Sequence, residues 1–324
     1  MRVFINGFGR IGRSVLRAWA LSPQLWPGLD IAGVNDIASP DMCAHLFEYD
    51  SVFGPWRGSV ALTTGCLVVN GKAIPLHQTS DISTLDLTGV SVVMECTGRA
   101  DSKAVAQRGL TAGAGRVLIS GPANAADLTL VLGANDAALA RQKIVSNASC
   151  TTNALAPLVR LLHQNWGVVT GSMTTIHCYT GSQPTVDAPA ADFARSRAAA
   201  LSMVPTTTSA SRLLDHVLPD IAGRIEGSAV RVPVASVSCV DLAVVTERPA
   251  TPEAVNAAFH AAGGVIGVTD RALVSTDLRA RPESIVMATP ETRATRAGLL
   301  RVFGWYDNEW GFSNRMLDVA LRMG

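Results

Sequence analysis

The sequence predicts an α/β protein of two domains, in which a doubly wound parallel sheet is followed by an α+β domain built on a mostly antiparallel sheet. Short β-rich runs alternate with helical patterns in the first half, and long β-rich runs dominate from about Gly167. A chain of 324 residues also exceeds the usual size of one hydrophobic core. We expect one domain at residues 1–149, completed by a C-terminal helix at about 309–324, and the other at residues 150–308.

The first domain is expected to contain a parallel sheet because its strands and helices alternate. Helices are expected from about Ile11, near Met42 and from about Ser102, so that each connects one strand to the next as a crossover. Crossovers of this kind cover both faces of a sheet, which fits the apolar character of the strands. The expected strands are RVFIN (2–6), DIAGVN (30–35), VSVVME (90–95), RVLIS (116–120) and KIV (143–145).

The second domain is expected to be mostly antiparallel because its β-rich runs are long and few helices separate them. Between the first two runs lies a polar stretch, residues 181–208, without clear periodicity, and a loop of that length is usually functional or disordered. The runs are VVTGSMTTIHCYT (168–180), SAVRVPVASVSCVDLAVVT (228–246) and GLLRVFGWYD (298–307).

Composition excludes several classes of function. Hydrophobic residues make up 48% and charged residues 16%, which is typical of a folded globular chain. The net charge of +1 provides no field to attract nucleic acid or an anionic membrane. The N-terminus enters an apolar strand at once, without a signal peptide, and no apolar run is long enough for a membrane helix, so we expect the cytoplasm. The cysteines show no CxxC spacing, so neither a metal site nor a disulfide framework is indicated.

A glycine-rich turn follows the first strand and precedes the first helix, which is the context of a Rossmann-type nucleotide-binding fingerprint. It consists of Gly7, Phe8, Gly9, Arg10, Ile11 and Gly12. Its glycines permit close approach of a pyrophosphate, which the helix N-terminus attracts. Asp36 ends the next strand, where a carboxylate can accept from ribose hydroxyls and repel a 2′-phosphate. NAD is therefore favoured over NADP, although such glycines also occur in ordinary turns and Asp36 could be a helix cap.

Cys150 is the candidate nucleophile because it stands between a predicted strand and the helical run ALAPLVRLLHQNW. A helix N-terminus stabilises a thiolate and is expected to lower the pKa of the thiol. Taken alone, a cysteine in an intracellular protein is more often a small buried hydrophobe. The residues around Cys150 decide between these interpretations.

Three motifs, INGFGRIGR, SNASCTTN and WYDNEWGFSNR, closely resemble those of the NAD-dependent, phosphorylating glyceraldehyde-3-phosphate dehydrogenase family. The resemblance runs from Arg2 through the C-terminal region. It implies that Cys150 is the catalytic cysteine and that His177 is the base that activates its thiol. We interpret Cys178, beside His177, as structural, because side chains alternate along a strand.

The resemblance also implies two anion sites beside Cys150. Thr180, Ser182 and Arg231 match the site for the substrate's phosphate, and Ser149, Thr208, Ser209 and Arg195 match the site for the attacking inorganic phosphate; we add Thr151 to these phosphate residues. Asn308 matches the residue that holds the nicotinamide, and we place Thr97, Gly98 and Ser120 in the cofactor site. Residues 181–208 match an S-shaped loop that lines a neighbouring subunit's NAD pocket, which implies a homotetramer.

The implied reaction is the glycolytic oxidation of glyceraldehyde 3-phosphate to 1,3-bisphosphoglycerate, through a hemithioacetal and a thioester on Cys150. Ala154, Pro184 and Ser209 depart from the common family pattern, and residues 278–295 depart most. Two alternatives therefore stay open. One is an erythrose-4-phosphate dehydrogenase in which water replaces phosphate, and the other is a non-catalytic NAD-binding or RNA-binding relative.

Overall fold

The computed structural model describes residues 1–100 and 102–324 and divides the chain into two compact units. The first unit comprises Met1–Leu130, Asp136–Ala148 and Phe312–Gly324, and the second comprises Val131–Asn135 and Ser149–Gly311. Each unit is built around a sheet of its own, and the C-terminal helix α7 (Trp310–Met323) falls almost entirely within the first.

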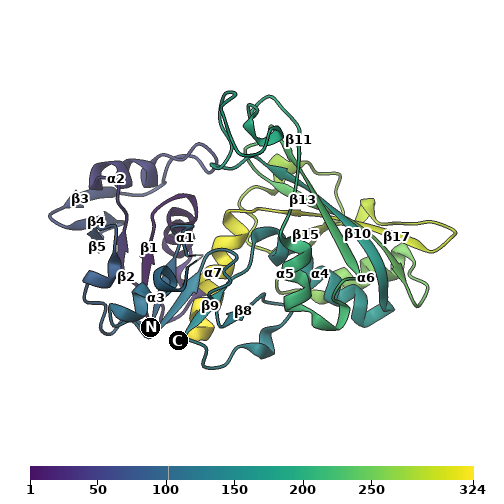
Figure 1. Cartoon of the computed structure of the whole chain (residues 1–324), viewed down its shortest axis with the longest axis horizontal. Coiled ribbons are helices and arrows are strands. Elements are labelled where there is room, and N and C mark those ends of the chain that lie inside the picture. Colours follow the sequence, from purple (N-terminus) through teal and green to yellow (C-terminus); the bar gives the residue numbers. More distant parts are fainter. Residues whose placement is uncertain (101) are drawn as a thin grey trace. The chain divides into compact units, whose positions relative to one another are not determined.

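The sheet of the first unit has the strand order β3-β4-β5-β2-β1-β6-β7-β9-β8. From β5 to β8 all pairings are parallel, whereas β3, β4 and β5 pair antiparallel at one edge (Figure 1). The strands are β1 (Arg2–Asn6), β2 (Asp30–Asn35), β3 (Val60–Thr63), β4 (Cys66–Val69), β5 (Lys72–His77), β6 (Val92–Glu95), β7 (Arg116–Ile119), β8 (Leu128–Thr129) and β9 (Ile144–Ser146).

Helices connect the parallel strands as crossovers: α1 (Arg10–Leu21), α2 (Pro40–Glu48) and α3 (Lys103–Thr111), with 3-10 turns η1 (Pro23–Leu25), η2 (Ile82–Thr84) and η3 (Asp136–Ala138). The core strands are apolar because both faces are covered; β6 is buried along its whole length. α7 is tied to this unit by a 2.7 Å hydrogen bond from Trp26 Nε1 to Asp318 Oδ1.

The chain passes from β1 to β2 on one side and later returns to β6 on the other side of β1. Ligands of doubly wound sheets bind at the carboxyl ends of strands where the order reverses in this way. Asn6, Asn35 and Glu95 end these three strands and are register partners: Asn6 pairs with Asn35 in β2 and with Glu95 in β6. The fold therefore places their side chains at the expected ligand-binding edge.

The second unit has a mixed, mostly antiparallel sheet with the order β11-β12-β10-β13-β17-β15-β14, and β16 pairs with β17. Parallel pairing occurs between β10 and β12 and between β14 and β15. The strands are β10 (Val168–Cys178), β11 (Val204–Thr206), β12 (Ile225–Val232), β13 (Ser238–Thr246), β14 (Ile266–Thr269), β15 (Ile285–Ala288), β16 (Arg293–Ala294) and β17 (Leu299–Tyr306). Both sheets thus agree with the predicted fold class.

The helices of the second unit are α4 (Cys150–Trp166), α5 (Ala210–Val217) and α6 (Pro252–Ala262), with 3-10 turns η4 (Ala194–Ser196), η5 (Pro219–Ile221), η6 (Ser275–Leu278) and η7 (Thr289–Glu291). The predicted β-rich run at residues 228–246 is divided between β12 and β13, which flank β10 on opposite sides. Pro233 follows β12 directly and cannot donate a ladder hydrogen bond, which ends the strand there. Among the described residues, no helix is both long and apolar enough to cross a membrane.

Candidate active site

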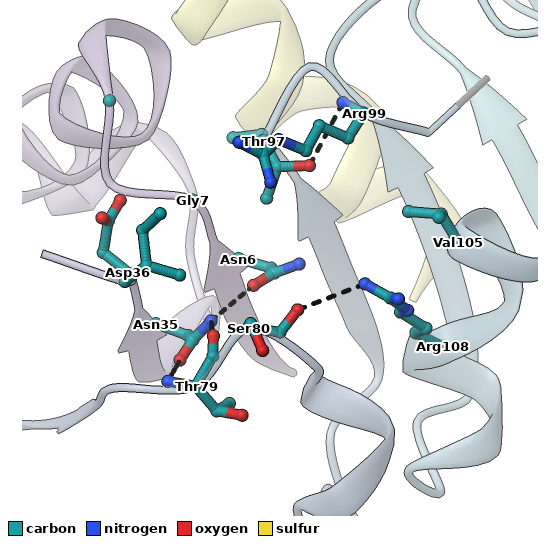
Figure 2. Close-up of a pocket in the computed structure, with 13 residues that line it drawn as sticks. Asn6, Gly7, Asn35, Asp36, Thr79, Ser80, Thr97, Arg99, Val105 and Arg108 are labelled. Atoms are coloured by element: carbon teal, nitrogen blue, oxygen red, sulfur yellow. Dashed lines mark hydrogen bonds between the residues drawn. The ribbon is translucent and has the colours of Figure 1, made fainter. Parts of the chain in front are cut away.

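A cavity of about 230 Å³ lies at the carboxyl ends of β1, β2 and β6 in the first unit (Figure 2). Of the residues predicted to bind cofactor, it brings together Gly7, Gly9, Asp36 and Thr97. It is completed by Asn6, Asn35, Ile37, Thr79, Ser80, Cys96, Arg99, Val105 and Arg108. Most of these residues lie at or just after the ends of strands. Their positions in the sequence relative to the predicted strands could therefore have marked them as candidates for this cavity.

The three glycines of the fingerprint fit a bound pyrophosphate, each for a different reason. A Cβ on Gly7, whose φ is +91°, would lie 2.7 Å from the backbone nitrogen of Thr97. A Cβ on Gly12 would lie 2.0 Å from the carbonyl oxygen of Gly7, so this glycine lets α1 pack against the turn. A Cβ on Gly9 would meet nothing within 4 Å and would instead occupy the space before the helix N-terminus. That space is the one a pyrophosphate needs.

Asp36 is held in place by backbone groups on either side. Its Oδ2 accepts from Phe8 N at 2.6 Å and its Oδ1 accepts from Ala38 N at 2.9 Å. Figure 2 shows its carboxylate pointing toward the glycine turn that begins at Gly7. The free lone pairs of a carboxylate fixed in this way can accept from the two hydroxyls of a ribose.

The other predicted cofactor residues do not line this cavity. Phe8 stacks on Phe47, and Arg10 pairs with Asp50. Ile11 and Gly12 lie in the first turn of α1. Gly98 has a positive φ in the turn after β6, and Ser120 N donates to the carbonyl of Glu95 at 3.0 Å. Asn308 belongs to the second unit. The residues of the first unit among them belong to the turns that form the cavity or to the elements next to these turns, rather than to its surface.

A second cavity, of about 400 Å³, lies in the second unit at the N-terminus of α4. It brings together nine of the residues that the sequence indicated: Ser149, Cys150, Thr151, His177, Ser182, Arg195, Thr208, Ser209 and Arg231. Thr180 is bonded to one of them, because its Oγ1 lies 2.9 Å from Ser182 Oγ. α4 begins at Cys150 because Ser149 caps it, accepting from Thr152 N at 3.0 Å.

Cys150 and His177 are in contact: Cys150 Sγ lies 3.6 Å from His177 Nε2. His177 stands on β10 opposite Arg231 of β12, its register partner. Arg231 Nη1 lies 2.6 Å from His177 Nδ1 and donates to the Cys178 carbonyl at 2.9 Å. A guanidinium can only donate, so this contact requires a lone pair on Nδ1. Nδ1 also lies 2.7 Å from the Cys178 carbonyl, a contact that requires a proton on Nδ1, so the two contacts belong to opposite tautomers of His177.

Burial controls the protonation of this pair. Burial raises the pKa of the Cys150 thiol, although Arg231 and the backbone N–H of Thr151 act in the opposite direction. This differs from the lowering expected at a helix N-terminus, because desolvation outweighs it. Burial, followed by the charge of Arg231, lowers the pKa of His177 to about 4. At neutral pH the pair is therefore a thiol beside a neutral imidazole.

Arg195 lies among hydroxyl groups on the wall of this cavity. Its Nε donates to Thr206 Oγ1 at 2.6 Å and its Nη2 donates to Thr207 Oγ1 at 3.0 Å. The motif match places Arg195 and Thr208 in one phosphate site, but Thr208 Oγ1 accepts from Ala210 N at 3.1 Å at the start of α5, whereas the hydroxyls that Arg195 contacts are those of the two preceding threonines. The arrangement offers one guanidinium and a row of hydroxyls to an anion.

Five residues that line this cavity were not predicted from the sequence: Thr175, Gln183, Thr206, Thr207 and Ala229. Two of them could have been predicted, because Thr206 and Thr207 directly precede Thr208 and extend its run of hydroxyl side chains. Thr175 stands two residues before His177 and so shares its face of β10.

Asn308 is buried next to Cys178. Its Oδ1 accepts from Cys178 Sγ and from Ser238 Oγ, both at 3.2 Å. Ser238 Oγ also accepts from Cys178 N at 3.1 Å. These contacts direct the NH₂ group of Asn308 away from Cys178 and Ser238, where it can donate to a ligand.

Comparisons with known proteins agree with this geometry. Residues 1–103 match the family described as glyceraldehyde 3-phosphate dehydrogenase, NAD binding domain, and residues 149–308 match the C-terminal domain of the same enzyme. NAD is accordingly the cofactor that the first unit binds. The chain is 44% identical over 330 positions to glyceraldehyde-3-phosphate dehydrogenase of Cereibacter sphaeroides and 43% over 333 to that of Xanthobacter flavus; each alignment covers 100% of this chain and 98% of the relative. The enzyme of Geobacillus stearothermophilus is 41% identical over 329 positions, with 99% and 97% covered. The chain belongs to the glyceraldehyde-3-phosphate dehydrogenase family.

Proposed function

We propose that this chain oxidises glyceraldehyde 3-phosphate to 1,3-bisphosphoglycerate with reduction of NAD, through a hemithioacetal and a thioester on Cys150. The observation that carries the proposal is the 3.6 Å contact between Cys150 Sγ and His177 Nε2 inside a cavity that Arg231 and Arg195 also line. A nucleophile, a base and two permanent cations in one cavity suit a substrate that carries both a carbonyl and a phosphate.

The first step is addition of the thiol to the aldehyde carbon, which needs a base. When Arg231 donates to a substrate phosphate, it no longer donates to His177 Nδ1. Nδ1 can then carry the proton and donate to the Cys178 carbonyl, which lies 2.7 Å away. That tautomer leaves a lone pair on Nε2, which takes the thiol proton as the carbon–sulfur bond forms. Binding of the phosphate and activation of the thiol are thereby linked through one guanidinium.

His177 gives the thiol proton to the alkoxide oxygen, which completes the hemithioacetal, and takes it back as the carbon loses hydride, so that a thioester remains on Cys150. NAD, when bound, supplies the hydride acceptor. The backbone N–H groups of Cys150 and Thr151, which lie against the thiol at the start of α4, can stabilise the oxyanion that forms whenever the carbonyl carbon is attacked. Inorganic phosphate, held by Arg195 with Thr208, Ser209 and Ser149, attacks the thioester and releases the acyl phosphate.

The test is spectrophotometric detection of NADH with purified protein, glyceraldehyde 3-phosphate and NAD. We expect steady turnover with phosphate or arsenate, and at most one equivalent of NADH per Cys150 without either. Erythrose 4-phosphate tests the alternative substrate, and turnover that is independent of phosphate would assign water as the second nucleophile. Binding of NAD without NADH formation from either aldehyde would contradict a catalytic role.

We also propose that residues 1–149 with the C-terminal helix bind the cofactor, that residues 150–308 carry out the chemistry, and that the protein is a cytoplasmic homotetramer. Within the proposed S-shaped loop (residues 181–208), Phe193 is 95% exposed, Leu201 84% and Met203 74%, which supports coverage by another subunit. All six cysteines are free thiols, as is usual in a reducing compartment. Light scattering of the purified protein tests the tetramer, and cell fractionation tests the compartment.

A further inference from the structure

A buried carboxylate lies beneath the proposed cofactor cavity without lining it. Glu95 ends β6, and only 2% of it is exposed. Its Oε1 accepts from Thr97 N at 3.0 Å and from Thr97 Oγ1, and its Oε2 accepts from Asn6 Nδ2 at 2.5 Å. Its main contacts are thus to residues that form the cavity.

The hydrogen bonds continue from Asn6 along the carboxyl edge of the sheet. Asn35 Nδ2 donates to Asn6 Oδ1 at 2.8 Å, and Asn35 Oδ1 accepts from Thr79 N at 3.0 Å (Figure 2). Asn35 Nδ2 also donates to the Thr79 carbonyl at 3.0 Å. A single chain of side chains therefore runs from Thr79 through Asn35 and Asn6 to Glu95 and ends on Thr97.

The direction of every bond in this chain is determined by its two ends. Thr79 N and Thr97 N are backbone groups that can only donate. From the Thr79 end, Asn35 must present oxygen to Thr79, so it presents NH₂ to Asn6, and Asn6 in turn presents NH₂ to Glu95. From the other end, Thr97 also presents a donor. Two donors therefore converge on position 95.

Only an acceptor without hydrogens satisfies both ends. An ionised carboxylate has two acceptor oxygens and nothing to donate, whereas a side-chain amide must present NH₂ to one of its neighbours. Wherever the amides rotate, one contact between two donors would remain in a buried site, which costs more than the loss of one hydrogen bond.

We propose that Glu95 is a positioning residue of the cofactor site, required as the single acceptor-only group that lets this chain of hydrogen bonds close. Gly7 follows Asn6, Asp36 follows Asn35, and Thr97 is bonded to Glu95 directly, so the chain fixes three parts of the cavity wall at once. The inference rests on the proposed function only in taking this cavity as the NAD site.

The test moves the carboxylate one position along the chain. Glu95→Gln leaves two donors facing each other, and Asn6→Asp places two carboxylates in contact. Each single variant of the full-length protein should bind NAD at least about tenfold more weakly in calorimetry and should have a lower Tm. The double variant Asn6→Asp/Glu95→Gln again contains one acceptor-only group and keeps the charge of the native protein. It should recover most of the lost Tm and at least half of the loss in log Kd.

Glu48→Gln is the matched control, because it removes a carboxylate from the same unit outside this chain and should leave Kd unchanged. If Glu95→Gln alone does not yield soluble protein, recovery of soluble protein by Asn6→Asp is the expected result. A double variant no better than Glu95→Gln, or a Glu95→Gln variant that binds NAD as the native protein does, would overturn the proposal. Failure of the native protein to bind NAD would instead refute the proposed cofactor site.

Discussion

Replacing Arg231 by alanine should change kcat/KM in two separable and opposing ways. Arg231 is proposed to bind the substrate's phosphate, and it also lies 2.6 Å from His177 Nδ1. A hydrogen bond between charged groups contributes about 1.5–3 kcal/mol, which corresponds to roughly ten- to hundredfold in kcat/KM. The contact with His177 involves a neutral acceptor and is worth about 0.5–1.5 kcal/mol, or roughly two- to tenfold.

The assay is steady-state NADH formation by the native protein and by Arg231→Ala, with glyceraldehyde 3-phosphate and with unphosphorylated glyceraldehyde. The phosphorylated substrate should lose the larger factor reduced by the smaller one, because the native Arg231 must give up His177 to bind the phosphate. Glyceraldehyde should gain up to the smaller factor, because without Arg231 the Nδ1 atom of His177 can carry the proton and Nε2 can accept the thiol proton.

Arg212→Ala is the matched control, since Arg212 is an exposed arginine of α5 that does not line the cavity. A loss with glyceraldehyde as large as the loss with glyceraldehyde 3-phosphate, or an undiminished rate with glyceraldehyde 3-phosphate, would refute the assignment of Arg231 to the phosphate. An unchanged or lower rate with glyceraldehyde would refute the proposed effect on His177.

Three further outcomes are expected. Iodoacetamide should alkylate Cys150 before the buried Cys43, Cys178 and Cys239, at a rate that rises with pH above neutral because the raised pKa leaves little thiolate at pH 7; peptide mapping that finds one of these three labelled first would contradict this. Asp36→Ala should raise the KM for NAD roughly tenfold and narrow the preference over NADP, so that an unchanged ratio of kcat/KM values would exclude Asp36 as the discriminator. Thr208→Ala should raise the KM for inorganic phosphate by roughly three- to tenfold while KM for the aldehyde stays constant, and a change in the aldehyde KM alone would reverse the assignment.

The fold class was predictable because strong periodic signals coincide with it. The strands ending at Asn6 and Asn35 begin and end as their apolar runs do, and the helix after Gly9 starts where the glycine turn allows it. The antiparallel edge formed by β3, β4 and β5 was not predicted. The sequence does contain a signal for this hairpin, namely the dipeptide Asn70-Gly71. In the structure these two residues have φ values of 50° and 80°, as in the tight turn of a hairpin. The strands β3 and β4 have only four residues each and β5 has six, so none of them forms a long periodic run in the sequence.

Residues of the candidate site could be predicted where they belong to a recognised motif. They could not be predicted where their role depends on contacts that only the folded chain makes. Cys150 and His177 are 27 positions apart in sequence, and only their motifs connected them before the structure placed them 3.6 Å apart. Glu95 had no comparable signal, because its importance arises from its register with Asn6 and from the donors on either side. Hydrogen-bond direction is a property of the assembled edge, and no local pattern contains it.

The protonation of Cys150 shows the same limit in terms of energy. A helix N-terminus contributes about 0.3–1 kcal/mol, less than the 1.36 kcal/mol that shifts a pKa by one unit. Complete burial can shift a pKa by several units, and the depth of burial depends on how α4 and β10 pack together. The raised pKa of the thiol and the lowered pKa of His177 both disfavour an ion pair in the free protein. In the proposed mechanism the proton is transferred when the aldehyde arrives, and His177 can accept it only after Arg231 leaves Nδ1 for the substrate's phosphate. A phosphorylated aldehyde would activate the thiol that attacks it, and an unphosphorylated one would not.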